Sequence, residues 1–236
     1  MSETNNPHTA PESKLLQARY HLVSYTQPAE EMRTLGIETP MDLVGYCARV
    51  SNPKNQLNTD TAHKLIRFLI NRAEWSPLEM VDVTFGITTA RDISRQILRH
   101  RSATFQEFSQ RYAEVDGART CFREARYEHP TNRQSSVRCD NVEDIEWWIN
   151  AQQSVINLTQ AVYQEARRRH FAKEVARVVL PEGLTLSDLF MKAPIRTWIH
   201  YLALRSGNGT QLEHQDIAHG LAQAITKVFP VEEISS

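Results

Sequence analysis

The sequence predicts an α+β fold, in which several helices pack around a small, mainly antiparallel sheet. Residues 80–88 alternate apolar and polar side chains, as expected for a strand with one buried face. Residues 142–171 repeat their apolar positions with a period of about 3.6, which is typical of one long amphipathic helix. Because no repeat and no linker-like tract interrupts the chain, we expect a single domain over residues 16–236, preceded by a flexible polar tail over residues 1–15.

Composition and charge restrict the class of protein. Of the 236 residues, 41% are hydrophobic and 23% are charged, and the formal net charge is -1, as in an ordinary globular protein. A pI near 6.8 argues against a general nucleic-acid binder, which is usually strongly basic. No apolar run approaches the roughly 20 residues of a membrane span, and the N-terminus has no signal-peptide core. We therefore expect neither nucleic acid nor a membrane as a partner.

Cysteine and histidine usage indicates a cytoplasmic protein without a metal. The three cysteines show no CxxC spacing, which fits a reducing compartment and argues against both a disulfide framework and a zinc site. The nine histidines include no HExxH or other metal spacing. We therefore expect no metal ligand.

Cap and turn signals place the elements before the alternating strand. Residues 20–25 predict a first strand. Thr39, Pro40 and Asp42 combine a hydroxyl cap, a first-turn proline and an acid at the positive end of the helix dipole, so they predict a helix start. A further helix is expected after the polar residues 58–60, and it ends before a Trp-Ser-Pro turn.

The elements after residue 118 include the long helix. At about 28 residues this helix would span roughly 42 Å, which is more than a small domain needs. It is explained either by packing against a partner subunit or by a core helix that is broken once. The remaining expectations are a strand or extended connection over 119–126, a polar loop over 128–139, and helices over 174–180, 186–205 (divided at Pro194 into a lead-in and a helix) and 214–229.

A basic segment over residues 91–112 follows the alternating strand. It contains five arginines and one histidine against two acids. Arg91, Arg95 and Arg99 recur every four residues, so in a helix they form one stripe. Forked cations followed by short hydroxyl and amide side chains suit a phosphorylated ligand. The alternative is a surface helix held by ion pairs.

Within this segment, Arg99-His100-Arg101 is followed after seven residues by Ser109, which is the signature spacing of the flavin-dependent thymidylate synthases. The chain resembles this family over roughly residues 18–229. Further matches occur in family order at 48–51, 76–79, 174–177 with 179–181, and 204–205. One such match would be weak, but several in order are specific.

The resemblance implies an enzyme that methylates dUMP at C5 to give dTMP. The carbon would come from methylenetetrahydrofolate, and FAD reduced by NADPH would supply the hydride. The resemblance also implies a homotetramer whose active sites are shared between subunits.

The same resemblance assigns the site residues. Arg205 would be the catalytic residue, because a fixed guanidinium beside N3-C4-O4 of uracil stabilises the negative charge that makes C5 nucleophilic. No cysteine falls in a matched motif, and Ser109 has no recognisable base, so neither is expected to act as a nucleophile. The residues expected to bind dUMP are Gln96, Arg99, Glu107, Ser109, Gln110, Arg111, Arg177 and Arg205. The residues expected to bind FAD are Ser51, Ser76, Glu79, Arg99, His100, Arg101, Glu107, Arg196 and His200.

The chain departs from the family pattern at several positions. Thr104 and Gln106 replace a serine and an asparagine with similar hydrogen-bonding groups. Residues 192–194 replace a stretch that often supplies an asparagine to the flavin. Glu74 stands where a histidine is common, and this keeps open a deoxyuridylate hydroxymethylase of the same fold, in which water rather than hydride completes the reaction. A non-enzymatic nucleotide- or RNA-binding protein is a further alternative.

Two arginines of the stripe match no ligand role. Arg91 and Arg95 are expected to be structural, and Asp82 or Asp92 are their expected partners. The basic segment therefore divides into a supporting helix up to Arg95 and a ligand-binding part over residues 96–111, which would serve the flavin diphosphate and the nucleotide phosphate.

Overall fold

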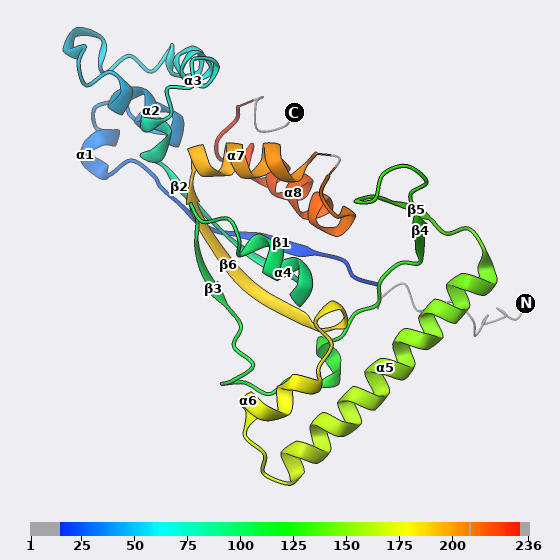
Figure 1. The fold of residues 1–236 in the computed structure, drawn as a ribbon. Coiled ribbons are helices and arrows are strands. Elements are labelled where there is room, and N and C mark those ends of the chain that lie inside the picture. The colour runs from blue at the N-terminus through cyan, green and yellow to red at the C-terminus, as the bar shows by residue number, and fades with distance from the viewer. Residues whose placement is uncertain (1–14, 208, 232–236) are drawn as a thin grey trace, which may run out of the picture. The chain divides into compact units, whose positions relative to one another are not determined.

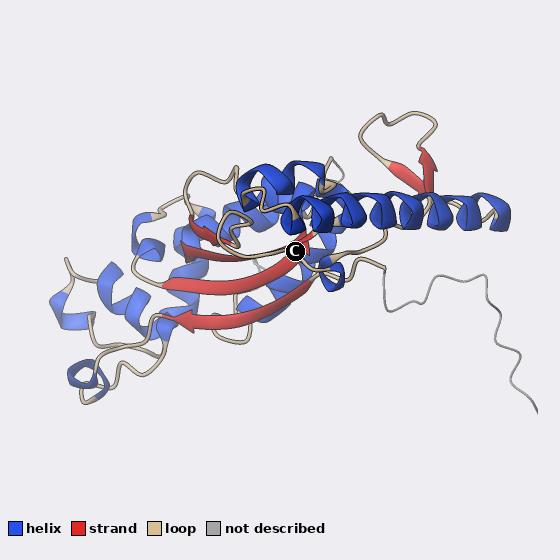
Figure 2. Cartoon of the chain, turned by 90° about the horizontal axis from the view of Figure 1, so that it is seen from below, coloured by secondary structure: helices blue, strands red, loops and turns tan. Residues whose placement is uncertain are grey.

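The computed structural model, which describes residues 15–207 and 209–231, confirms the α+β class (Figure 1). The strands form one antiparallel sheet and one separate short hairpin (Figure 2). The sheet has the order β1-β2-β6-β3, so its two longest strands lie in the middle. Its strands are β1 (Arg19–Tyr25), β2 (Asp82–Ala90), β6 (Leu186–Pro194) and β3 (Thr104–Glu107).

Contacts divide the chain into two compact units, and each unit is built from three chain segments. The first unit consists of Met1–Arg19, Thr88–Arg99 and Glu107–Leu189. The second unit consists of Tyr20–Ile87, His100–Gln106 and Phe190–Ser236. The expectation of one domain over residues 16–236 stays a prediction, and the expected tail lies, apart from Leu15, outside the described residues.

The second unit contains the predicted helix start at Thr39, which caps α2. The Thr39 hydroxyl accepts a hydrogen bond from the Asp42 backbone N–H at 3.1 Å, and the Asp42 carboxylate accepts one from the Thr39 N–H at 2.9 Å. This capping box satisfies two amide groups that the helix itself cannot pair. The helices of this unit are α1 (Glu30–Arg33), α2 (Pro40–Ala48), α3 (Ala62–Asn71), α7 (Ile195–Arg205) and α8 (Leu212–Ile225), with 3-10 turns η2 (Pro53–Asn55) and η3 (Ser76–Glu79).

The core of the second unit forms around Trp198 on α7. Its indole N–H donates to the carbonyl of Val83 on β2 at 3.1 Å, and its ring meets Phe85 edge-on with centroids 5.4 Å apart. All three side chains are fully buried. The apolar face predicted for β2 is therefore the face that anchors α7.

The first unit contains the long helix, α5 (Val142–Arg168), which Figure 1 shows as one unbroken rod. Asn141 caps it by accepting from the N–H groups of Glu143 and Asp144. Its 27 residues correspond to about 40 Å. The other elements are α4 (Arg91–Ile97), β4 (Arg126–Glu128), β5 (Ser136–Arg138) and α6 (Lys173–Ala176), with 3-10 turns η4 (Gly117–Arg119), η5 (Arg177–Val179) and η6 (Glu182–Leu184).

Two sequence predictions are wrong in this part of the chain. Residues 186–194 form strand β6 rather than a helical lead-in, and Ser187, Leu189, Met191 and Ala193 are its buried alternate positions. This period of two is a strand signal. The expected polar loop over residues 128–139 includes the β4–β5 hairpin, in which Tyr127 lies opposite Val137. Residues 119–126 are mostly the expected extended connection, with single bridges at Thr120 and Phe122.

The described residues contain no candidate for a membrane-spanning helix, a metal site or a disulfide. Among them, no helix combines the length and the apolar character that crossing a membrane requires. No group of three or more His, Cys, Asp and Glu side chains in this part is arranged to hold a metal ion. Cys47, Cys121 and Cys139 form no disulfide among these residues.

Candidate active site

The basic stripe divides in the structure, because Arg91 is buried on α4, Arg95 is exposed, and Arg99 is exposed beyond the end of the helix. Strand β2 runs directly into α4, and the Arg91 backbone N–H donates to the Thr185 carbonyl at 2.9 Å. Arg91, Ile93 and Ile97 are buried on the same helix. Burial lowers the pKa of Arg91, although the neighbouring Glu107 opposes this shift. The alternative of a surface helix held by ion pairs therefore fits Arg95, which is 46% exposed and pairs with Glu107 and Glu182, but it does not fit the buried Arg91.

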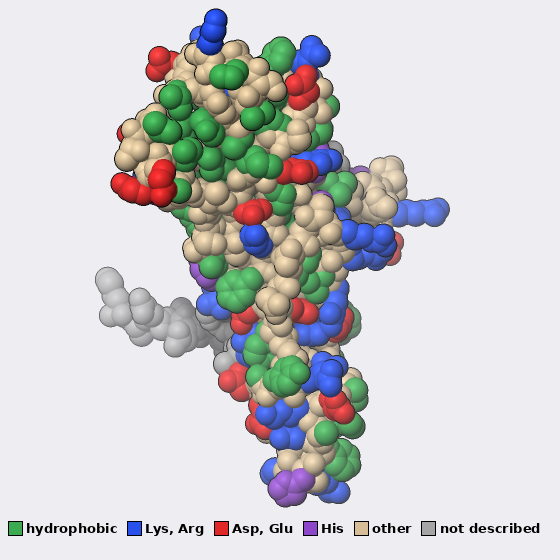
Figure 3. All heavy atoms as spheres, turned by 90° about the vertical axis from the view of Figure 1, so that its left-hand side faces the viewer, with side chains coloured by type: hydrophobic (Ala, Val, Ile, Leu, Met, Phe, Trp, Pro, Cys, Tyr) green, Lys and Arg blue, Asp and Glu red, His purple; other side chains and the backbone are tan. Residues whose placement is uncertain are grey.

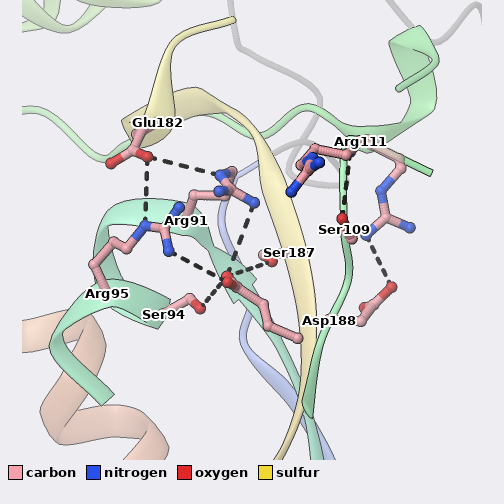
Figure 4. Close-up of polar contacts among 10 residues, drawn as sticks. Arg91, Ser94, Arg95, Ser109, Arg111, Glu182, Ser187 and Asp188 are labelled. Carbon is pink, nitrogen blue, oxygen red and sulfur yellow. Dashed lines mark hydrogen bonds and ion pairs between the residues drawn. The ribbon is translucent and has the colours of Figure 1, made fainter. Parts of the chain in front are cut away.

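Glu107, at the end of β3, is the carboxylate that compensates this stripe (Figure 4). Its Oε1 accepts from the hydroxyl groups of Ser94 at 2.7 Å and Ser187 at 2.9 Å. Its carboxylate also lies 3.4 Å from Nη1 of Arg95 and 3.9 Å from Nη1 of Arg91. In this structure, Glu107 therefore supports α4 by pairing with its arginines and Ser94. The expected contact of Glu107 with a ligand stays a prediction.

The expected partners of the two supporting arginines were wrong. Arg91 and Arg95 share a second carboxylate, Glu182, at 3.8 Å and 3.5 Å. Asp82 instead pairs with Lys192 at 2.9 Å. Asp92 pairs with Arg123. Sequence proximity suggested the aspartates, but folding brings β3 and the turn after Pro181 to α4.

The segment after β3 forms a tight turn around Ser109. Its carbonyl accepts from the N–H groups of Tyr112 and Ala113, both at 3.1 Å, and its hydroxyl accepts from the Arg111 N–H at 3.4 Å. Gln110 in this turn is buried, and its Nε2 has no hydrogen-bond partner among the described residues. A buried amide that lacks a partner is costly, so a ligand or water that accepts from it would stabilise the site.

Four arginines of the expected site differ from the supporting ones. Within residues 15–207 and 209–231, no hydrogen bond or ion pair involves their guanidinium groups, although Arg91 and Arg95 are fully engaged. Two of the four belong to the first unit and two to the second. They are Arg99, Arg177, Arg101 and Arg205. Arg111 has only an exposed pair with Glu174 at 3.4 Å.

In the second unit, several residues expected to bind FAD come together at α7. Arg196 on α7 pairs with Glu79 on η3. His200, one turn further, meets the ring of Trp75 edge-on with centroids 4.5 Å apart. Ser76 belongs to the same turn as Glu79. Trp75 was not predicted as a site residue, and its position directly before the matched motif was the only signal for it.

His100 lies deeper in the second unit, beside Tyr201, with ring centroids 5.3 Å apart. Its Nε2 is buried and has no partner among the described residues. Burial lowers the pKa of His100, and the positive charges of Arg205 and His200 lower it further. The imidazole is therefore neutral at neutral pH. The Nε of Arg205 is likewise buried and without a partner in the described chain.

The two expected ligand sets separate between the two units. The residues expected to bind dUMP belong to the first unit, except for Arg205. The residues expected to bind FAD belong to the second unit, except for Arg99 and Glu107. Ser51 and Arg101 are exposed in the second unit.

Among the described residues, guanidinium groups without a partner occur in both units, as do buried amide and imidazole nitrogens without one, and groups of these kinds suit anionic, hydrogen-bonding ligands. The chain belongs to the family described as Thymidylate synthase complementing protein, whose pattern matches residues 22–231. It is therefore a member of a family of enzymes. This membership argues against the alternative of a non-enzymatic nucleotide- or RNA-binding protein.

Two relatives and one solved structure illustrate the similarity. The chain is 41% identical over 209 residues to a probable flavin-dependent thymidylate synthase of Paramecium bursaria Chlorella virus 1, which covers 89% of this chain and 94% of the relative. It is 43% identical over 192 residues to the flavin-dependent thymidylate synthase of Synechocystis sp., covering 81% and 87%. The crystal structure of the UMP/dUMP methylase PolB from Streptomyces cacaoi, bound with 5-Br dUMP, has the same fold, with a TM-score of 0.76, 23% identity and 93% coverage of both chains.

Proposed function

We propose that this chain catalyses the reductive methylation of dUMP to dTMP. Methylenetetrahydrofolate would supply the carbon, and FAD reduced by NADPH would supply the hydride. The observation that carries this proposal is the set of four arginines whose guanidinium groups have no partner within the described part of the chain and which lie at or beside the positions that match the family motifs. The two relatives above are named as flavin-dependent thymidylate synthases.

The first unit offers the groups for a nucleotide phosphate. Among residues 15–207 and 209–231, the guanidinium groups of Arg99 and Arg177 have no partner, and that of Arg111 has only the exposed pair with Glu174. Forked donors of this kind bind phosphate oxygens through two parallel hydrogen bonds. The Ser109 hydroxyl and the unpaired Nε2 of Gln110 add neutral donors at the same turn.

Arg205 would act on the uracil ring. A guanidinium beside O4 favours negative charge on the N3-C4-O4 system, and this charge makes C5 nucleophilic. The side chain is half-buried at the end of α7, and its Nε has no partner among the described residues. Since a donor in a partly water-excluded place acts more strongly than one in water, this position suits electrostatic stabilisation.

The residues of the second unit fit an anionic, hydrogen-bonding cofactor such as FAD. The unpaired Nε2 of His100 and the guanidinium of Arg101 are unused polar groups there. Ser51, Ser76, Glu79, Arg196 and His200 would complete the set. When bound, FAD carries the hydride that reduces the transferred carbon to a methyl group. The neutral imidazole of His100 can donate to it or accept from it without adding charge.

A homotetramer with shared sites would explain two exposed apolar regions. The first is a stripe on α5 formed by Val155, Leu158 and Val162, which recurs at the spacing of a helix–helix seam. The second, in the second unit, is the group of apolar side chains over α1–α3 in Figure 3; Val50, after α2, and Phe68, on α3, are exposed apolar residues of this part of the chain. Apolar regions of this kind commonly mark interfaces.

The test is to incubate the purified chain with dUMP, methylenetetrahydrofolate, NADPH and FAD and to identify the product by mass. We expect dTMP; a hydroxymethyl product would identify the hydroxymethylase instead. Glu74, the residue that keeps this alternative open, forms an exposed ion pair with Arg72 at 2.7 Å. Arg205→Ala should lose about a hundredfold or more in turnover while it keeps its flavin colour. Arg133→Ala, at an exposed arginine outside every matched motif, is the control. Unchanged turnover in Arg205→Ala would remove Arg205 from the mechanism.

A further inference from the structure

A buried hydrogen-bonded pair lies one helical turn before Arg205. Tyr201 on α7 and His214 on α8 are both fully buried, and the Tyr201 hydroxyl lies 2.9 Å from Nε2 of His214. Neither residue belongs to a motif that was matched in the sequence. Two apolar side chains of similar size would fill this space without the desolvation cost of polar groups, so burial alone does not explain the pair.

The pair belongs to a cluster that reaches the candidate active site within the second unit. Tyr201 meets the His214 ring at a centroid distance of 5.8 Å and the His100 ring at 5.3 Å. Arg205 follows Tyr201 by four residues, so both side chains lie on one face of α7. His100 and Arg205 are the two residues of the cluster with buried nitrogens that have no partner in the described chain. Tyr201 thus connects the helix α8 to both of them.

Only one of these four side chains is charged at neutral pH. Burial, with a smaller contribution from the charge of Arg205, lowers the pKa of His214 to about 4. Burial also raises the pKa of the Tyr201 hydroxyl, which therefore stays protonated. His100 is neutral for the reasons given above. Among the described residues, no ion pair involves Arg205, and Glu213, the buried carboxylate next to His214 on α8, has an interaction of its own.

We propose that Tyr201 and His214 are positioning residues for Arg205. Their hydrogen bond fixes a polar but uncharged wall along the face of α7 that carries the guanidinium, and the wall supplies no internal counter-ion. The guanidinium then keeps its attraction for the negative charge that develops on a bound pyrimidine. A carboxylate in the wall would neutralise this charge, and an apolar wall would hold the guanidinium less firmly. This inference rests on the proposed role of Arg205.

The test measures kcat, the KM for dUMP, flavin content and Tm in variants of the full chain. His214→Gln retains a neutral amide that can hydrogen-bond to Tyr201, and it should keep kcat within about threefold. His214→Glu places a counter-ion beside Arg205 and should lower kcat at least about thirtyfold. Tyr201→Phe should lower kcat by about five- to tenfold. In all three, the KM for dUMP should change by less than about threefold, because the phosphate groups are untouched.

Tyr163→Phe is the matched control, since it removes another buried hydroxyl, which accepts from the Val115 N–H at 3.2 Å in the first unit. A purely structural role would lower Tm in Tyr201→Phe and Tyr163→Phe alike without a selective change in kcat. Wild-type kcat in folded Tyr201→Phe and His214→Glu, with Arg205→Ala inactive, would overturn this inference alone. Wild-type turnover in Arg205→Ala would overturn both the proposed function of Arg205 and this inference. Should His214→Glu not fold, the kcat of Tyr201→Phe, compared with the kcat of His214→Gln and Tyr163→Phe, still tests the inference.

Discussion

Replacement of Glu107 by alanine is expected to destabilise the folded chain by about 3 kcal/mol. The Arg91 side chain is only 7% exposed, and Glu107 is one of its two carboxylate partners. Removing one partner of a buried ion pair typically costs about 3–5 kcal/mol, because a charge stays buried without full compensation. The Arg95 side chain is 46% exposed, so its lost pair adds little. The remaining pairing of Arg91 with Glu182 at 3.8 Å moderates the loss toward the lower end of the range.

The assay is urea denaturation, with thermal unfolding as a second probe. For a chain of this size, about 3 kcal/mol corresponds to a fall in Tm of about 6–12 °C. Glu107→Gln keeps an acceptor for Ser94 and Ser187 and should lose about half as much. Glu182→Ala is the matched control, because Glu182 faces the same two arginines but is 52% exposed. It should lose less than about 1 kcal/mol.

Two outcomes would refute this reasoning. The first is a Glu107→Ala variant with wild-type stability. If that variant also lost dUMP or flavin binding, Glu107 would be a ligand residue rather than the support of α4. The second is a Glu182→Ala variant that is destabilised as much as Glu107→Ala. The lower exposure of Glu107 would then not make its ion pairs stronger than those of Glu182.

Three further predictions concern ligand binding, pH and assembly. Arg99→Ala and Arg177→Ala should each weaken dUMP binding by about ten- to a hundredfold in calorimetry, because each loses a charge-assisted hydrogen bond. The control Arg133→Ala should bind dUMP as the wild type does. Wild-type affinity for dUMP in the first two variants would refute the phosphate assignment. The free energy of unfolding should fall by about 2 kcal/mol between pH 7.5 and pH 5.0 because of His214. The pKa of His214 is about 4 in the folded chain and near 6.5 in the unfolded chain. As the pH falls, the unfolded state therefore takes up the proton first and is favoured. His214→Gln should show a smaller pH dependence of the urea midpoint, and an undiminished one would contradict this assignment. If the α5 stripe lies in the interface of the proposed homotetramer, Leu158→Glu should lower the particle mass in light scattering relative to the wild type, and an unchanged mass would exclude the stripe from that interface.

The departures from the family pattern acquire physical meaning in the structure. Glu74 is compensated by Arg72, and Lys192 by Asp82, so both charges are paired on the protein itself. Thr104 occupies an exposed position of β3. None of these substitutions leaves an uncompensated charge in the described part of the chain.

Features that depend on residues close together in the chain were predictable from the sequence. The capping box at Thr39 and Asp42 was predictable because a cap is made within four residues, and the long helix α5 because its apolar period continues without a break. The expectation of a ligand-binding segment around Arg99 and Ser109 also came from spacing along the chain. Strand β6 was not predicted, although its alternation is present in the sequence. It runs without a break into the helix that begins after Pro194, so residues 186–205 were interpreted as helical throughout.

Which polar and charged side chains already have a partner depends on contacts between distant parts of the chain, which only the folded structure shows. Glu107 and Ser187 are 80 residues apart in sequence and yet share a hydrogen bond, and no local pattern encodes such a contact. The same holds for Tyr201 and His214, which belong to different helices. Whether an arginine is a support or a free cation depends on the carboxylates that folding brings to it. For this reason Arg91 and Arg205, which look alike in the sequence, have different environments in the folded protein.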